Sequence, residues 1–279
     1  MSVEQLIGCP FWWHLATIEV FEKLNARYSY FRFMEPTGII KPGSNLRDGI
    51  FDSKLDPMAH QGIGGTLSED SNEVDILVAA HTTPEYLAFS QHPALKAFVR
   101  KLMGWSEDVE CVRTLVRHNL PHSASTAIHY DKIFLRASES YFLTAWVPIG
   151  DCAADGGGLL YLEDSSTLGL DIEKDFSARA QVLPPEERIS AYNAHMTSTG
   201  AISQDAATFG REEGGGRRWL TADYEAGDVV FHNPYIIHAS GKNEDSLGRI
   251  RLSTDLRFYE KGVPIDERWM NTWKPGDGL

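Results

Sequence analysis

The sequence predicts an α+β protein with a mainly β core, arranged as a sandwich or jelly roll. From about residue 110 onward the chain reads as short strand-like segments separated by turn residues, in an early and a late cluster. The clearest helical pattern lies before that point, so we expect the helices to pack outside the sheets. With 279 residues and 42% hydrophobic residues, the chain is long enough for one large domain with a substantial core.

Two helices are expected in the N-terminal part. After Pro10, apolar residues at roughly helical spacing predict a helix over residues 10–27. A stronger pattern predicts a helix over residues 92–103, where Pro93 suits the first turn and Gly104 suits the stop. The stretch between Met34 and Glu73 is rich in Pro and Gly and reads as loop.

The β core is expected over residues 110–260 of a single domain that spans residues 1–279. We expect the N-terminal part, 1–109, to be helical and loop-like and the tail, 261–279, to be loop-like. Between the strand clusters, residues 164–218 form an unusually long insertion with a short helix at 186–194. The expected strands cover residues 111–118, 126–135, 141–149, 159–162, 219–222, 228–232, 235–239 and 249–258.

Composition excludes several classes of function. The 26 Lys and Arg residues against 39 Asp and Glu residues give a net charge of -13, which argues against nucleic-acid binding. No apolar run reaches the roughly 18 residues of a membrane span, and no secretory signal is visible. The three cysteines, Cys9, Cys111 and Cys152, form no CxxC pair. We therefore expect reduced thiols and a cytoplasmic protein without membrane partners.

His129 and Asp131 stand two residues apart in an expected strand, so their side chains point to the same face. A second histidine from a neighbouring strand would complete a set of two imidazoles and one carboxylate, which is the ligand set of non-haem Fe(II) oxygenases. His238, at the end of a later strand-like run, is the candidate. Either histidine alone would more often be an ordinary core residue. His232 shares the parity of His238 and is interpreted as structural.

The motif order around these residues resembles the phytanoyl-CoA dioxygenase-like family. His129-Tyr130-Asp131 is followed by Trp-Val-Pro-Ile-Gly and Asp-Gly-Gly-Gly-Leu, then by Gly-Asp-Val-Val-Phe, His238-x-Ser-Gly and an arginine. The resemblance covers about residues 110–260. Within the family, Phe-Leu-Arg and Leu-Thr-Ala-Trp-Val-Pro resemble the fungal type that tailors natural products.

The resemblance implies a double-stranded β-helix that binds Fe(II), 2-oxoglutarate and O2. It implies His129, Asp131 and His238 as metal ligands and catalytic residues. It also implies oxidation of a C–H bond of a small organic substrate, such as a terpenoid or polyketide, with formation of succinate and CO2. Hydroxylation, desaturation and oxidative rearrangement remain open as outcomes.

The distal carboxylate of 2-oxoglutarate needs a cation, and the fork of a guanidinium grips a carboxylate better than an ammonium does. Arg249, eleven residues after His238, matches the family position, and Arg251 has the same strand parity and stays an alternative. Further expected contacts to the cosubstrate come from Ser240, Trp146 and Thr126.

The insertion at 164–218 is expected to form a substrate-binding lid, because loops on a rigid barrel usually carry recognition. Its candidate contacts are Tyr192, His195, Met196 and Phe209. The expected partner is a small molecule, with a homodimer left open. A cupin-like binding protein and a zinc hydrolase are the alternative functions, since two histidines and a carboxylate also suit Zn²⁺.

Overall fold

Two antiparallel β-sheets form the centre of the protein in a computed structural model that describes residues 11–14, 18–60, 71–192 and 200–274. The larger sheet has the strand order β1-β7-β4-β9-β2, and β3 also pairs with β9. The smaller sheet has the order β6-β5-β8. Strands that are neighbours in a sheet are far apart in the sequence, as in a jelly roll. The expected α+β fold with a double-stranded β-helix core is confirmed.

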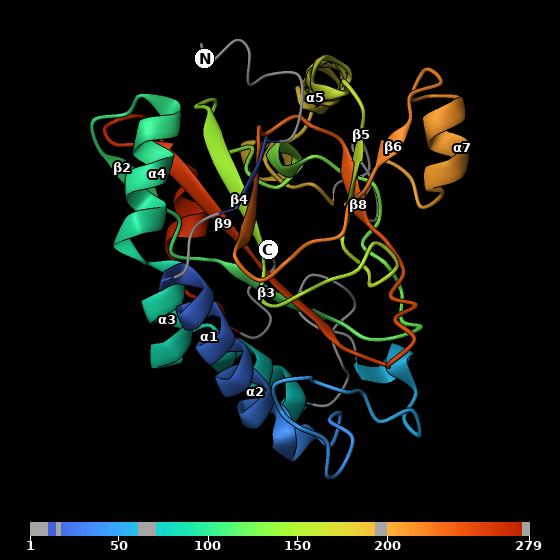
Figure 1. Cartoon of the computed structure of the whole chain (residues 1–279). Helices are drawn as coiled ribbons and strands as arrows, with labels where there is room; N and C mark the ends of the chain where they lie inside the picture. Colours follow the sequence, from blue (N-terminus) through green and yellow to red (C-terminus); the bar gives the residue numbers. More distant parts are fainter. Residues whose placement is uncertain (1–10, 15–17, 61–70, 193–199, 275–279) are drawn as a thin grey trace.

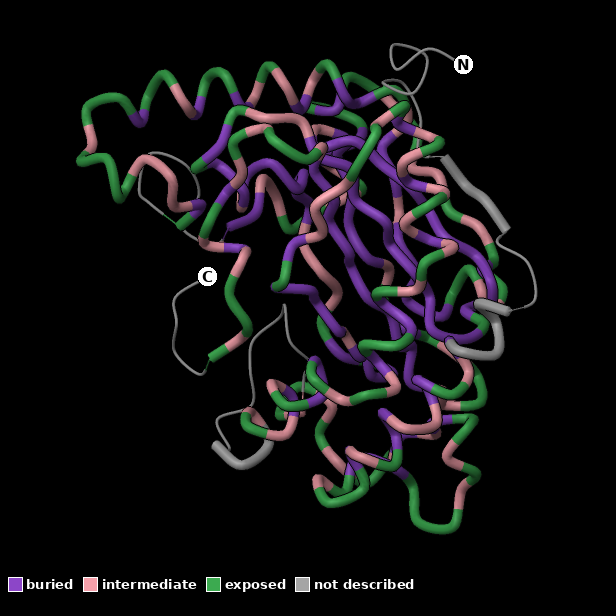
Figure 2. Tube along the Cα trace, turned by 90° about the vertical axis from the view of Figure 1, so that its left-hand side faces the viewer, coloured by how far each residue is buried: buried purple, intermediate pink, exposed green. Residues whose placement is uncertain are grey.

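The strands after residue 110 fall close to expected positions, whereas the two strands before it were not expected. Their bounds are β1 Phe11–His14, β2 Asp108–Glu110, β3 Leu115–Asn119, β4 Phe142–Pro148, β5 Leu159–Leu162, β6 Trp219–Leu220, β7 Asp228–His232, β8 His238–Ser240 and β9 Arg251–Glu260. The long strand β9 crosses the molecule diagonally and pairs with β2, β3 and β4 (Figure 1). Buried residues follow the strands of the core, and exposed residues lie on the outer helices and loops (Figure 2).

The first four α-helices gather on one side of the larger sheet, whereas α7 lies beside β6 (Figure 1). The helices are α1 Ile18–Met34, α2 Ser71–Ala80, α3 Pro84–Ser90, α4 Pro93–Met103, α5 Ser166–Ala180, α6 Pro185–Arg188 and α7 Ala206–Arg211. Short 3-10 helices are η2 Glu35–Thr37, η3 Pro57–His60, η4 Asp131–Ile133 and η5 Glu267–Met270. None of the described helices combines the length and the apolar character needed to cross a membrane.

Helix α4 begins and ends as the sequence predicts. Pro93 occupies its first turn, and Gly104 ends it in the left-handed conformation with φ 71°. Leu95, Val99 and Met103 are buried at a spacing of four residues, which is the apolar face of a surface helix.

Several expectations about helices were wrong, and α2, α3 and α7 were not expected. Residues 11–14 pair with β7 as a strand, so the helix expected at 10–27 begins only at Ile18 and runs to Met34. Ile189 to Ala194 was expected to continue the helix at 186–194, but α6 ends at Arg188. Helix α5 was not expected, because Ser, Gly and Asp within it weaken the helical pattern; its contacts to the β7–β8 loop, described below, stabilise it instead.

Candidate metal centre

His129 and His238 are brought together by the backbone. The amide of each residue donates to the carbonyl of the other, at 3.0 and 2.8 Å. Their imidazole rings lie with centroids 4.3 Å apart, and both side chains are buried. The pairing adds the segment that carries His129 to the smaller sheet beside β8, so residues more than a hundred positions apart share one end of the barrel.

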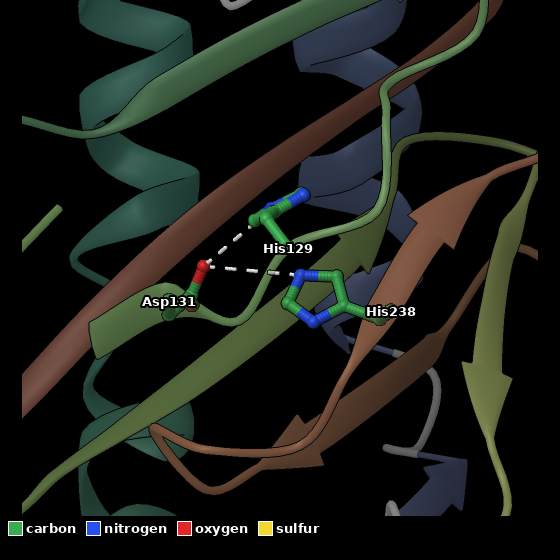
Figure 3. Close-up of side chains that lie close together, drawn as sticks. All are labelled: His129, Asp131 and His238. Atoms are coloured by element: carbon green, nitrogen blue, oxygen red, sulfur yellow. Dashed lines mark ion pairs between the residues drawn. The ribbon is translucent and has the colours of Figure 1, made fainter. Parts of the chain in front are cut away.

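Asp131 completes the cluster from the first residue of η4. The expected strand over 126–135 is in fact two isolated bridges, at Ile128 and His129, followed by this 3-10 turn. The carboxylate nevertheless faces both imidazoles: Oδ1 lies 4.0 Å from Nε2 of His129 and 3.8 Å from Nε2 of His238 (Figure 3). One ligand atom from each of the three residues lies within 4.8 Å of the others.

Hydrogen bonds orient both imidazoles for metal binding. Nδ1 of His129 lies 2.8 Å from the carbonyl oxygen of Ala127, and Nδ1 of His238 lies 3.0 Å from that of Ile236. A carbonyl can only accept, so each Nδ1 carries the proton and each Nε2 keeps its lone pair. Both Nε2 atoms then face the carboxylate, as they would around a shared metal ion.

The protonation states also suit a metal site. Burial lowers the pKa of His129 and, aided by its two neighbouring histidines, lowers the pKa of His238 well below its usual value. Burial alone would raise the pKa of Asp131, but Arg257 and His232 hold it well below the usual range. The cluster therefore presents two neutral imidazoles and one carboxylate, which is the state that binds a divalent cation.

Three residues around Asp131 were not expected to serve the site. Arg257 donates from Nη2 to Oδ1 at 3.0 Å and from Nε to Oδ2 at 3.3 Å. The Thr144 hydroxyl donates to Oδ2 at 2.5 Å. His232, interpreted as structural, contacts Oδ2 through Nε2 at 3.3 Å, and the hydroxyl of Tyr161 lies 3.0 Å from its Nδ1. Oδ2 is thus contacted by three side chains, while Oδ1 accepts from Arg257 and faces the two imidazoles.

Strand register explains how Arg257 and His232 reach Asp131. Thr144 on β4 pairs with Arg257 on β9 and with His232 on β7, so the three side chains lie side by side on one sheet. The even spacing from Arg251 to Arg257, which predicts that both side chains lie on the same face of a strand, was visible in the sequence. The contact to a carboxylate 126 residues away was not, because it depends on how the two sheets face each other.

Helix α5 supports the metal-bearing segments from outside. Ser165, just before the helix, accepts a hydrogen bond from the amide of Ile237 at 2.9 Å. Gly169 lies so close to the β7–β8 loop that a Cβ would be 2.0 Å from the carbonyl oxygen of Tyr235. Glu173 accepts from the hydroxyl of Tyr130 at 2.8 Å. This part of the 164–218 insertion is therefore packed support, and the expected lid function stays a prediction for the remainder.

The two candidate arginines for 2-oxoglutarate lie in different surroundings. Arg249 pairs with Asp245 at 2.6 Å, and its side chain is 36% exposed. Arg251 is 5% exposed and donates to the carbonyl of Gly157 at 3.0 Å and to the hydroxyl of Ser253 at 2.5 Å. Burial lowers the pKa of Arg251 to about 10. These contacts favour Arg251, the alternative, over Arg249 as an anion anchor inside the barrel.

The other residues expected near the cosubstrate are also inside the core. Ser240, two residues after His238, accepts from the amide of Thr126 at 2.6 Å, so these two residues do lie together. Trp146 is 1% exposed and packs edge-on against Tyr224 with ring centroids 4.8 Å apart. Their role in binding 2-oxoglutarate stays a prediction.

An open cavity of about 630 Å³ lies beside His129. Tyr192, a predicted substrate contact, lines it. Phe209, another, is instead 2% exposed in a hydrophobic cluster with Ile128 and Tyr130 and is not part of the cavity lining. His195 and Met196 lie outside the described residues. The rest of the lining includes Arg117, Phe134, Arg257, Arg268, Trp269 and Trp273.

Comparison with known proteins agrees with this architecture. A model of the phytanoyl-CoA dioxygenase (PhyH) family matches residues 65–250. No curated protein matches the sequence. The crystal structure of EctD from S. alaskensis is similar with a TM-score of 0.53 at 10% identity, covering 99% of this chain and 82% of that one. SnoK, a non-heme alpha-ketoglutarate-dependent carbocyclase from nogalamycin biosynthesis, has a TM-score of 0.47 at 19% identity, covering 72% and 70%. The nickel complex of the non-heme monooxygenase ThoJ has a TM-score of 0.46 at 16% identity, covering 91% and 73%.

Proposed function

Because the chain belongs to the phytanoyl-CoA dioxygenase family, we propose that it oxidises a C–H bond of a small organic molecule at the centre formed by His129, Asp131 and His238. It is an Fe(II)- and 2-oxoglutarate-dependent oxygenase. Membership in this family argues against the cupin-like binding protein and the zinc hydrolase. The observation that carries the proposal is the convergence of the three buried ligand atoms within 4.8 Å beside an open cavity.

The three side chains fit a non-haem iron. Two neutral imidazoles and one carboxylate oxygen occupy one face of a metal and leave the other positions open. With 2-oxoglutarate as cosubstrate, a bound iron would supply the activation of O2 needed for C–H oxidation, and succinate and CO2 would be the co-products. The cavity beside His129 would bring the substrate to the open face, and the hydrogen bonds at each Nδ1 hold the imidazoles in place before the metal arrives.

Arg251 is proposed as the anchor for the distal carboxylate of 2-oxoglutarate. It is a buried guanidinium whose hydrogen-bond partners in the described residues are a carbonyl and a hydroxyl, both uncharged. A buried positive charge of this kind is stabilised by an anion. The carbonyl that it contacts, at Gly157, is close to the strand that carries Ser240, since a Cβ on Gly241 would be 3.8 Å from Cα of Gly157.

A secondary metabolite such as a terpenoid or polyketide remains the proposed substrate class, and the fungal type of enzyme stays a prediction. Both rest on the phrases around His129 and Trp146 in the sequence. The cavity beside His129 is open to solvent and has aromatic side chains in its lining, as a site for a small organic molecule requires.

Anaerobic addition of Fe(II) and 2-oxoglutarate tests the proposal. A visible charge-transfer band should form, and admission of O2 should yield succinate, measured by mass spectrometry. The variant Asp131→Ala should show neither signal. A wild-type protein that binds Zn²⁺ and hydrolyses model esters, but forms no band and no succinate, would support the hydrolase instead.

A further inference from the structure

The cavity beside His129 has a wall from the C-terminal segment, part of the tail at 261–279 that was expected to be loop-like. Trp269 lies on η5 and Trp273 follows it shortly, and both line the cavity together with Arg268. The segment comes after β9, outside the insertion that was expected to supply the substrate contacts. We call Trp269 and Trp273 the C-terminal wall.

The polar edges of both indoles are already satisfied. Nε1 of Trp269 donates to the carbonyl of Phe134 at 3.2 Å, and Nε1 of Trp273 donates to that of Thr114 at 2.6 Å. Indole has no other polar atom. The wall can therefore offer the cavity only carbon surface, with each ring held in one orientation by its own hydrogen bond.

Each ring of the wall also carries a guanidinium. Arg257 lies 4.8 Å from the ring centroid of Trp269, and Arg113 lies 4.2 Å from that of Trp273. Trp269 thus packs on the same arginine that holds Asp131. A ligand that contacts the wall would lie next to the metal centre, within reach of the groups that orient it.

Arg268 fastens the wall to two other parts of the cavity. Its guanidinium forms a bidentate pair with Asp266, at 2.9 and 2.6 Å, and donates to the carbonyl oxygens of Phe134 and Ile189 at 2.9 and 3.1 Å. Phe134 follows the metal-bearing turn, and Ile189 precedes the lining residue Tyr192. The C-terminal segment, the metal segment and the insertion are therefore tied at one point, which makes the cavity preorganised.

The other residues of the cavity lining favour a flat, uncharged ligand. Phe134 and Tyr192 contribute two more rings, with centroids 6.3 Å apart. The three arginines of the lining are each paired with a carboxylate: Arg117 with Asp255, Arg257 with Asp131 and Arg268 with Asp266. The cavity therefore offers aromatic faces without an uncompensated positive charge.

One hydrogen-bond donor in the cavity lining has no partner among the described residues. Nη1 of Arg257 is buried and has no hydrogen-bond partner among the described residues, although the other two nitrogens of that guanidinium hold Asp131. A buried donor without a partner costs free energy unless an acceptor arrives. An uncharged oxygen of a bound molecule would satisfy it near the metal.

From these contacts we infer that the substrate carries a flat, aromatic or conjugated ring system with an uncharged oxygen acceptor, and that Trp269 and Trp273 determine this specificity. The inference rests on the proposed function, because it places that ring beside the oxidising centre. Stacking against fixed aromatic faces adds affinity beyond the burial of apolar area alone, so a planar ring should bind better than a saturated ring of the same skeleton.

Binding is measured by calorimetry with the anaerobic Fe(II) and 2-oxoglutarate complex and three probes. The probes are 2-acetylnaphthalene, its decahydro counterpart and 2-ethylnaphthalene. We expect 2-acetylnaphthalene to bind about tenfold more tightly than the saturated ketone, and more tightly than the hydrocarbon that lacks the acceptor. Equal affinities, or no binding of any probe, would overturn the inference.

Variants test whether Trp269 and Trp273 cause the preference for a planar ring. Trp269→Leu and Trp273→Leu should each reduce the preference for the planar ketone, whereas Trp269→Phe and Trp273→Phe, which keep a ring, should retain most of it. Trp219→Leu is the matched control, because Trp219 donates to the carbonyl of Ala206 away from this cavity, and it should bind like the wild type. A preference that survives in both Leu variants contradicts the role of the wall. A wild-type protein that never forms the charge-transfer band refutes the proposed function itself, which is a separate result.

Discussion

Arg257 and Asp131 form a buried pair in which each side chain is 2% exposed and Nη2 lies 3.0 Å from Oδ1. The same guanidinium reaches Oδ2 through Nε, so the carboxylate is held by two nitrogens in the geometry that suits arginine. This pair fixes a proposed metal ligand from the opposite sheet. It also keeps the carboxylate ionised without a metal, as the lowered pKa of Asp131 indicates.

Substitution of Arg257 should lower the stability of the metal-free protein more than that of the metal-bound protein. In Arg257→Met the buried carboxylate loses its main counter-charge, which should cost roughly 3–5 kcal/mol of unfolding free energy. A bound divalent cation replaces part of that charge, so the loss should be smaller with Fe(II) present. Urea unfolding with and without anaerobic Fe(II) measures both values.

Arg218→Met is the control for that experiment, because Arg218 pairs with Glu163 at the surface and should change stability little. An equal loss with and without the metal in Arg257→Met would show that the arginine acts on the fold and not through Asp131.

The metal ligands are tested one at a time. His129→Ala, Asp131→Ala and His238→Ala should each abolish turnover and weaken Fe(II) binding, since each removes one of three converging donors. His232→Gln should still bind Fe(II), because Nε2 of His232 contacts Oδ2, the oxygen that faces away from the two ligand imidazoles. Equilibrium dialysis measures the metal. If His232→Gln loses iron as completely as His238→Ala does, His232 belongs to the ligand set.

The two candidate arginines for binding 2-oxoglutarate, Arg249 and Arg251, are compared directly. Arg251→Met should raise the apparent KM for 2-oxoglutarate, because it removes charge-assisted hydrogen bonds worth about 2–4 kcal/mol of binding free energy. Arg251→Lys should restore only part of that binding free energy. Arg249→Met should have a small effect, because that side chain already pairs with Asp245. Steady-state kinetics of succinate formation measure both. A larger effect at Arg249 would return the anchor to the position that family resemblance implied.

His81 should make stability depend on pH. Burial lowers its pKa to about 4, and the amide of Val116 donates to its Nε2, which only a neutral ring can accept. The unfolded chain takes up this proton near pH 6.5, whereas the folded chain resists it until about pH 4. The unfolding free energy should therefore fall by up to about 3 kcal/mol as pH drops from about 6.5 to about 4.

Urea unfolding across this pH range, for the wild type and His81→Gln, measures the dependence. The variant should be less stable at neutral pH, since it loses the ring that bonds Val116 and Leu77, but its pH dependence should be flatter. Parallel pH profiles for the two proteins would rule out His81 as the source.

The sequence by itself determined the fold class, the strand clusters and the three candidate ligands. Strand alternation and turn residues are local signals, and they placed β3, β4, β5, β7 and β9 within a few residues of where they lie. His129 and Asp131 were recognisable because their spacing is local, and His238 because its motif order resembles a known family. The helix at 93–103 was predictable for the same reason, since Pro93, Gly104 and one apolar face all lie within it.

Only the tertiary structure decided what surrounds those ligands. Strand parity allows Arg249 and Arg251 alike to face the interior, and the choice depends on whether an acidic partner such as Asp245 lies beside the guanidinium. Helix α5 forms because the β7–β8 loop and Tyr130 offer it contacts that its own sequence does not reveal. Arg257 reaches Asp131, and Trp269 packs on Arg257, through pairings between distant segments. Such contacts follow from how two sheets and a C-terminal segment close around one cavity, and no local pattern in the chain encodes them.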